Sequence, residues 1–209
     1  MRNLRYSPWL AALFLLAAVP ALVSEAWAQA PAGAPVRIRG TVESLDGNTL
    51  SVKSREGQDL KIALAPNYTV TAVVKKSLSD IKDGDFVAST GMKKDGKLYA
   101  VEVRIFPEAL RGRGEGQYSW DLMPGSTMTN ATVTGSSTVS DGKVLKVTYK
   151  GETSDFIVGP NCPVFGYTNA DSSLLKKGAY VFLIANKGAD GALSAASVTA
   201  EKDGVKPPQ

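Results

Sequence analysis

The amino-acid sequence repeats itself once, and this repeat is the feature that most restricts the possible fold. An Asp-Gly motif followed by an alternating run, at residues 46–52, returns 95 residues later at 141–147. A second Asp-Gly motif, at 95–98, returns at the same offset at 190–193. Three further matches keep this order to within one residue of shift. The period is far longer than that of solenoid repeats, so each copy is predicted to be a small domain and the chain to descend from duplication of one module.

Within each copy, apolar side chains recur at every second residue, which is typical of half-buried β-strands rather than helices. Val36, Ile38 and Val42, for example, alternate with polar or charged neighbours. Asp-Gly pairs supply residues that tolerate positive φ, as tight hairpin turns require. Helical candidates are confined to single turns at 77–82 and 172–177. We therefore expect strands at 35–44, 48–54, 58–65, 68–75, 84–91 and 97–106, and again near 129–137, 143–149, 153–158, 162–167, 178–186 and 192–200.

These strands predict an all-β protein made of two tandem, small antiparallel β-barrels of OB-like type, related by internal duplication. A barrel closes its own sheet edges, which an isolated meander leaves exposed. The first barrel is placed at 35–106 and the second at 129–201, with a connector at 107–128 and a polar tail at 202–209. Because a copy of ~70 residues has a thin core, we expect the two copies to pack on one another or to share a strand.

The first 28 residues have the features of a cleaved signal peptide. Arg2 and Arg5 precede an apolar run at 10–23 that is shorter than the ~20 residues needed to span a bilayer. Small residues follow, and cleavage after Ala28 is preferred because cleavage two residues later would place Pro31 beside the cut bond. An uncleaved membrane anchor is the alternative. The leader predicts a soluble exported protein, periplasmic or, as the alternative, secreted, which does not span the membrane after cleavage.

The sequence contains no histidine and one cysteine, Cys162. The first absence excludes Ser-His-Asp and Cys-His catalysis and every His-containing metal site. A single cysteine excludes an internal disulfide, thiolate zinc sites and iron–sulfur clusters. We expect no catalytic residues, no metal site and no cofactor. The remaining enzymatic alternative is a carboxylate-dependent hydrolase, whose two carboxylates would come from scattered positions.

The net charge of +4 is spread along the chain rather than gathered in one stripe. Nucleic-acid binding needs a concentrated basic surface, so we expect no nucleic-acid partner. A glycan, a peptide or an envelope protein is the expected class of partner.

The connector at 107–128 has no counterpart after the second copy, and it contains the candidate binding residues. Three alternating glycines permit close approach of a ligand to the backbone. Tryptophan offers a stacking surface and arginine an anion fork. As one hypothesis, the connector forms a ligand groove at the junction of the barrels, lined by Arg111, Arg113, Glu115, Tyr118, Trp120 and Asp121. As the alternative, Trp120, Leu122 and Met123 merely pack as a plug between the barrels.

Several short motifs resemble a known family. They are Gly-Thr-Val at 40–42, the Asp-Gly run at 46–52, Ser-Leu-Ser-Asp-Ile-Lys-x-Gly-Asp at 77–85 and Gly-x-Leu-x-Ala at 96–100. Together they resemble bacterial exported domains of unknown function with OB-like β-barrels. The central part, 105–131, with its Trp-Asp-Leu and Pro-Gly-Ser-Thr-Met segments, is similar to one subgroup of them.

The resemblance implies architecture and location rather than activity. Some members of the family are labelled as metal-transporter components, and relatives often have histidine near the position of Gln117. Because this chain has no histidine, no metal role is carried over. The expected function is that of a non-enzymatic binding or envelope-associated module, and the alternative is an envelope scaffold or stress protein without a small ligand.

Overall fold

The computed structural model describes residues 35–140 and 142–207, so the predicted signal peptide at 1–28 lies outside the described residues. The described chain is all-β, as the alternation predicted. Its strands are β1 (Pro35–Asp46), β2 (Thr49–Ser54), β3 (Asp59–Lys76), β4 (Phe86–Lys94), β5 (Lys97–Ile105), β6 (Gly116–Ser119), β7 (Ser126–Val139), β8 (Gly142–Tyr149), β9 (Glu152–Val158), β10 (Val164–Ala170), β11 (Tyr180–Lys187) and β12 (Leu193–Ala200). Short 3₁₀ turns η1 (Leu78–Asp80), η2 (Glu108–Leu110) and η3 (Ser172–Leu174) join some of them. The described residues include no helix long and apolar enough to cross a membrane.

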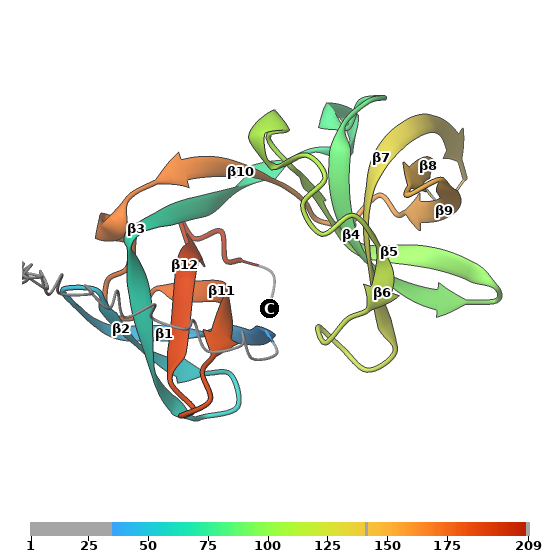
Figure 1. The fold of residues 1–209 in the computed structure, drawn as a ribbon. Coiled ribbons are helices and arrows are strands. Elements are labelled where there is room, and N and C mark those ends of the chain that lie inside the picture. The colour runs from blue at the N-terminus through green and yellow to red at the C-terminus, as the bar shows by residue number, and fades with distance from the viewer. Residues whose placement is uncertain (1–34, 141, 208–209) are drawn as a thin grey trace, which may run out of the picture.

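The strands close into two rings of five, which form the two lobes in Figure 1. In the first barrel the order is β1-β2-β3-β12-β11, and β11 returns to β1. In the second it is β7-β8-β9-β5-β4, and β4 returns to β7. Each ring has one parallel contact, β3 with β12 or β9 with β5, and its other contacts are antiparallel. The two barrels therefore have the same pattern of strand pairing.

Neither barrel is a contiguous segment of the chain, and this corrects the boundaries expected at 35–106 and 129–201. The hairpin β4–β5 leaves the first half of the chain to complete the second barrel, and β11–β12 completes the first. The physical cause is the length of β3, which is one strand of 18 residues where two were expected. Instead of turning back, β3 runs out of the first barrel along β10 and delivers the chain to the second barrel (Figure 1).

β3 and β10 form an antiparallel ribbon between the lobes. Its register runs from Val70↔Ala170 to Lys76↔Val164, with Val73↔Tyr167 at the centre. The central pair is separated by 94 residues, which is also the offset between Pro66-Asn67 and Pro160-Asn161 in the sequence. Val70 and Lys76 of β3 lie 94 residues before Val164 and Ala170 of β10, so this offset exchanges the pairs Val70↔Ala170 and Lys76↔Val164, as a two-fold axis at the Val73↔Tyr167 pair would.

Each barrel has its own hydrophobic core, and each core is built by both halves of the chain. In the first, Val42 and Ile62 are fully buried with Leu183 of β11 and Val198 of β12. The second is the set of buried residues centred on Phe156, in which Val87 and Val103 of the first half pack with Leu145 and Val147. We expected the two parts of the chain to pack on one another or to share a strand, whereas in the structure each half contributes a hairpin to the other barrel.

The turns follow the expected chemistry. Asp95 and Gly96 both have positive φ in the two-residue turn between β4 and β5. Lys150 and Gly151 do the same between β8 and β9. Residues 202–207, expected as a polar tail, instead fold back: they form a tight turn, and the Lys206 amine lies 3.6 Å from the centre of the Tyr180 ring. Strand β6 is also an addition, since no strand was expected in the connector.

Candidate functional site

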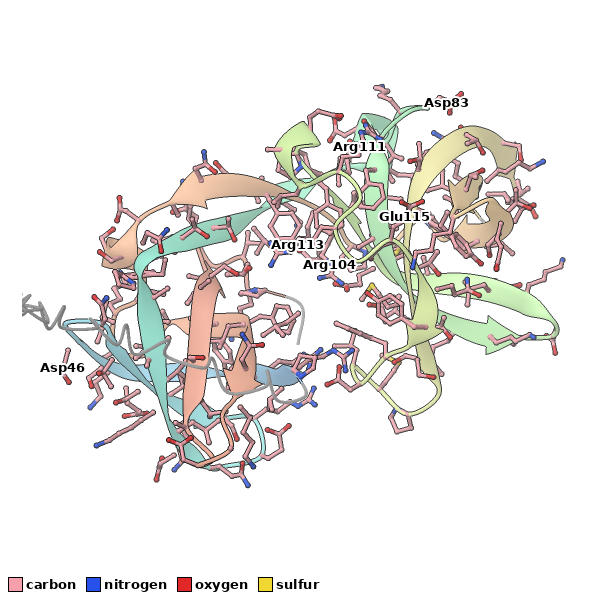
Figure 2. All side chains as sticks on the ribbon, in the orientation of Figure 1. Asp46, Asp83, Arg104, Arg111, Arg113 and Glu115 are labelled. Atoms are coloured by element: carbon pink, nitrogen blue, oxygen red, sulfur yellow. The ribbon has the colours of Figure 1, made fainter. Side chains whose placement is uncertain are left out.

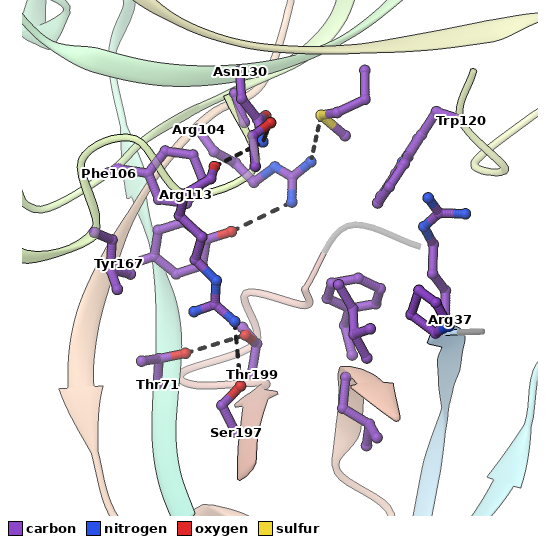
Figure 3. Close-up of a pocket in the computed structure, with 18 of the residues that line it drawn as sticks. Arg37, Thr71, Arg104, Phe106, Arg113, Trp120, Asn130, Tyr167, Ser197 and Thr199 are labelled. Carbon is purple, nitrogen blue, oxygen red and sulfur yellow. Dashed lines mark hydrogen bonds between the residues drawn. The ribbon is translucent and has the colours of Figure 1, made fainter. Parts of the chain in front are cut away.

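A cleft of about 320 Å³ lies between the two barrels. Strands β1, β3, β11 and β12 of the first barrel form one side, and β4, β5 and β7 of the second form the other. The connector and the β3–β10 ribbon complete its walls. Figure 3 shows this junction, where side chains from distant parts of the sequence converge. The cleft exists because the hairpin exchange holds the barrels side by side.

Three arginines line the cleft, Arg37 of β1, Arg104 of β5 and Arg113 of the connector. None of the described residues that line it is an aspartate or glutamate. In Figure 2, Arg104 and Arg113 lie between the lobes, whereas Arg111 lies toward the outer side of the second lobe. A wall that is cationic and free of carboxylates favours an anionic ligand.

Arg104 is buried, with only 5% of its surface exposed. Its Nη2 lies 3.0 Å from Oε1 of the buried Glu102, which also accepts a 2.8 Å hydrogen bond from Thr90. Its Nη1 donates to the hydroxyl of Tyr167 at 3.3 Å, while its buried Nε has no hydrogen-bond partner. Because Glu102 offsets its charge, Arg104 serves mainly as a fixed donor at the base of the cleft.

Hydroxyl groups cover the wall formed by β3 and β12. Thr71 and Thr199 share a hydrogen bond of 3.1 Å. Beside them, Arg113 donates to Oγ of Ser197 at 3.5 Å, a long contact that leaves most of its guanidinium donors free (Figure 3). Arg113 is exposed and has no carboxylate partner among the described residues. This end of the cleft therefore offers a cation with neighbouring hydroxyls.

Aromatic side chains line two further parts of the wall. The Arg37 guanidinium lies 4.2 Å from the centre of the Trp120 ring, in a cation–π contact. Tyr118 meets Trp120 edge-on, with ring centres 6.1 Å apart. Beside Arg113, Phe106 stacks on Tyr167 with ring centres 5.3 Å apart (Figure 3). The wall is thus suited to an apolar or aromatic body.

Asn130 of β7 holds the connector against the second barrel. Its amide nitrogen donates to the carbonyl oxygens of Arg113 at 3.1 Å and Gly114 at 3.0 Å. A third bond runs to the hydroxyl of Tyr118 at 3.3 Å. Gly114 has φ of +63°, and a Cβ there would crowd the Asn130 amide, so this close approach requires glycine. Asn130 therefore fixes the part of the connector that carries Arg113 and Tyr118.

The structure brings three of the six candidate residues to the cleft, namely Arg113, Tyr118 and Trp120. The other three candidates, Arg111, Glu115 and Asp121, make structural contacts outside the cleft. Arg111 pairs with Glu108 at 2.6 Å and donates to the carbonyl of Gly84, and Glu115 accepts a bond from the Lys150 backbone at 2.9 Å. Asp121 binds Arg39. Leu122 and Met123, named in the packing alternative, are half-buried and are not among the residues that line the cleft.

Sequence reasoning missed Arg37, Arg104 and Asn130, because they lie in strands. Glu102 and Arg104 are two residues apart, so their side chains leave the same face of the strand, opposite to that of Val103. Two charged residues on one face are typical of a face exposed to solvent. The signal in the sequence was that Glu102 and Arg104 carry opposite charges on that face and can therefore pair with each other.

Among the described residues, neither the cysteine nor the carboxylates form a second candidate site. Burial raises the pKa of the Cys162 thiol to about 12, and the charge of Glu102 adds to the rise, so the thiol stays protonated at neutral pH. Within residues 35–140 and 142–207, no three acidic or cysteine side chains gather in a way that would hold a metal ion. Asp46 and Asp83 illustrate the dispersal of the carboxylates, because they lie at opposite ends of the molecule (Figure 2).

No protein-family model, curated protein or solved structure matches this chain. The geometry of the cleft is therefore the basis for any functional conclusion.

Proposed function

We propose that this chain is an exported, non-enzymatic binding protein that holds an anionic ligand in the cleft between its two barrels. The observation that carries the proposal is the charge of the cleft wall, with three arginines and no carboxylate among its described residues. Glu102 offsets Arg104, so Arg37 and Arg113 supply the uncompensated charge. A ligand anion would complete their pairing.

The fold is consistent with this function. Each barrel is a three-stranded meander closed by a hairpin whose last strand runs parallel to the third. This arrangement supports the proposal that each barrel is of the five-stranded OB type, a fold that binds oligonucleotides and oligosaccharides. The two-fold relation at Val73↔Tyr167 supports duplication of one such module, with its last hairpin exchanged. The leader at 1–28 and the resemblance to exported barrel domains support a periplasmic location.

The lack of carboxylates among the described lining residues is also the reason why we propose no enzymatic role. General acid–base hydrolysis of a glycoside needs two carboxylates facing the substrate. The described residues that line the cleft provide none, and Asp121 beside it is held in a pair with Arg39. Ligand retention, rather than turnover, is the function that these side chains support.

Calorimetry and thermal unfolding test the proposal. The mature chain, 29–209, is titrated with four anions of different shape, namely benzoate, hydrocinnamate, glucuronate and phosphate. At least one should bind and raise Tm, and Arg113→Ala should weaken that binding about tenfold, since one charge-assisted pair is lost. Arg111→Ala is the matched control, because Arg111 lies in the same connector but outside the cleft. Failure of all four anions to bind, or equal loss in both variants, would contradict the proposal.

A further inference from the structure

We infer that the ligand of this cleft is an amphiphilic monocarboxylate, with one carboxylate on Arg113 and an apolar, preferably aromatic, body against Tyr118 and Ile184. The inference rests on the proposed function and narrows it to one chemical class. It is carried by three independent properties of the cleft: its exposed apolar side chains, the placement of its charges and its size.

The first property is exposed apolar surface. Among the described residues, three large hydrophobic side chains are exposed, Tyr118 at 37%, Val139 at 37% and Ile184 at 44%. Two of them, Tyr118 and Ile184, line the cleft, one from each side of the junction. Gathering exposed apolar surface at one place costs hydration free energy unless a partner covers it. A purely polar anion would leave this surface in water.

The second property is the placement of charge. Arg37 is engaged with the face of Trp120, and Arg104 is paired with Glu102. Arg37 is half-buried, which leaves Arg113 as the exposed guanidinium of the three, beside the hydroxyl of Ser197. A planar carboxylate matches the fork of one guanidinium. A phosphate dianion on Arg113 would bring a second negative charge into the cleft, and the other uncompensated cation, Arg37, lies across the cleft over the Trp120 ring (Figure 3).

The third property is size. A cavity of about 320 Å³ lies at the lower end of the range found for small-molecule sites. It accommodates a ring and a short acid chain. The same chemistry has two sources, a free aryl or branched acid and the C-terminal residue of a peptide that ends in an apolar side chain, because both present one carboxylate next to an apolar body.

The experiment compares ligands that differ in one property. Hydrocinnamate is titrated against hydrocinnamamide, which keeps the ring and lacks the charge, and against propionate, which keeps the charge and lacks the ring. Glucuronate and phosphate are the polar anions. Hydrocinnamate should bind about tenfold more tightly than each of the four. An acetylated tripeptide ending in phenylalanine, together with its amide, distinguishes the two sources: tighter binding of the peptide acid than of hydrocinnamate assigns a chain terminus, and the reverse assigns a free acid.

Two variants locate the apolar contact. Ile184→Ser should weaken hydrocinnamate binding several-fold and leave any binding of propionate unchanged, because only the ring contact is lost. Val139→Ser, at the third exposed hydrophobic side chain, lies outside the cleft and should change neither. If glucuronate or phosphate binds as tightly as hydrocinnamate, or if Ile184→Ser has no effect, the inference is overturned while the anion-binding function stands. If no anion binds, the proposed function itself fails.

Discussion

Arg39 and Asp121 join the first barrel to the connector through two parallel hydrogen bonds across 82 residues of sequence. The Nη1–Oδ2 distance is 3.0 Å and the Nη2–Oδ1 distance is 2.9 Å. The Arg39 side chain is 4% exposed, and that of Asp121 is 43% exposed. The pair therefore compensates a buried charge, and it holds the segment that carries Trp120 against β1.

Removal of the Asp121 carboxylate should destabilise the protein. In Asp121→Ala the buried guanidinium of Arg39 loses both bonds, and a buried polar group left without its partner costs about 1–3 kcal/mol. Urea unfolding measures the change in the free energy of unfolding. The double variant Arg39→Met with Asp121→Ala is the control, because it removes the unpaired charge and should recover part of the loss. A single variant as stable as the parent chain would show that the pair contributes nothing.

The same pair predicts a dependence on pH. Partial burial raises the pKa of Asp121, but the hydrogen bonds and charge of Arg39, together with the charge of Arg37, outweigh this and hold the pKa below its ordinary value of 3.8. A carboxylate with a lowered folded-state pKa stabilises the protein above the unfolded value and loses this contribution as the pH falls through the folded value. The stability difference between the parent chain and Asp121→Asn should therefore be constant from about pH 7 to 5 and shrink below about pH 4. Urea titrations at a series of pH values measure it, and a difference that grows on acidification would contradict the sign.

The sequence predicted the strands but not their partners. Period-two alternation shows which residues of a strand point inward, and it held for Val36, Ile38 and Val42, which pack in the first core. It did not hold for β4, where residues 86–91 are all buried. It does not show which barrel a strand completes. Pro66 and Asn67 look like a break between two strands, yet β3 continues through them as a bend, where the pairing with β12 shifts register. A local pattern does not distinguish a bend from a turn, and here that difference decides the topology.

The candidate site was predictable only where its composition was unusual. The connector stood out by its glycines and Trp120, and half of the residues chosen from it line the cleft. Arg104 did not stand out, because a charged residue at alternate strand positions is typical of a surface. It is buried because β10 runs beside β5 and the cleft residues cover its other face, and these contacts are long-range. The exchange that creates the cleft also creates the burial of Arg104.

Glycine at position 40 should be essential to the first barrel. Gly40 pairs with both Val181 of β11 and Ser54 of β2, at the point where β1 passes from one neighbour to the other. A Cβ there would overlap the carbonyl oxygen of Lys53. Gly40→Ala should lower the free energy of unfolding by about 1–3 kcal/mol, as overpacking does. Gly135→Ala is the matched control, since Gly135 also lies in a strand but a Cβ there meets no atom within 4 Å. Equal Tm values for the two variants would contradict the predicted overlap.

Cutting the chain in the connector should yield two fragments that depend on each other. Fragment 29–110 contains β1–β3 of the first barrel and the hairpin β4–β5 of the second. Fragment 111–209 contains β7–β9 of the second barrel and the hairpin β11–β12 of the first. Each core is therefore divided between the fragments, and the ribbon of β3 with β10 requires both. Neither fragment should be a folded monomer alone, and mixing should give a one-to-one complex that unfolds cooperatively. Light scattering gives the mass, and circular dichroism against the uncut chain follows unfolding. A monomeric 29–110 that unfolds cooperatively would show that β3 folds back and that each copy closes its own barrel.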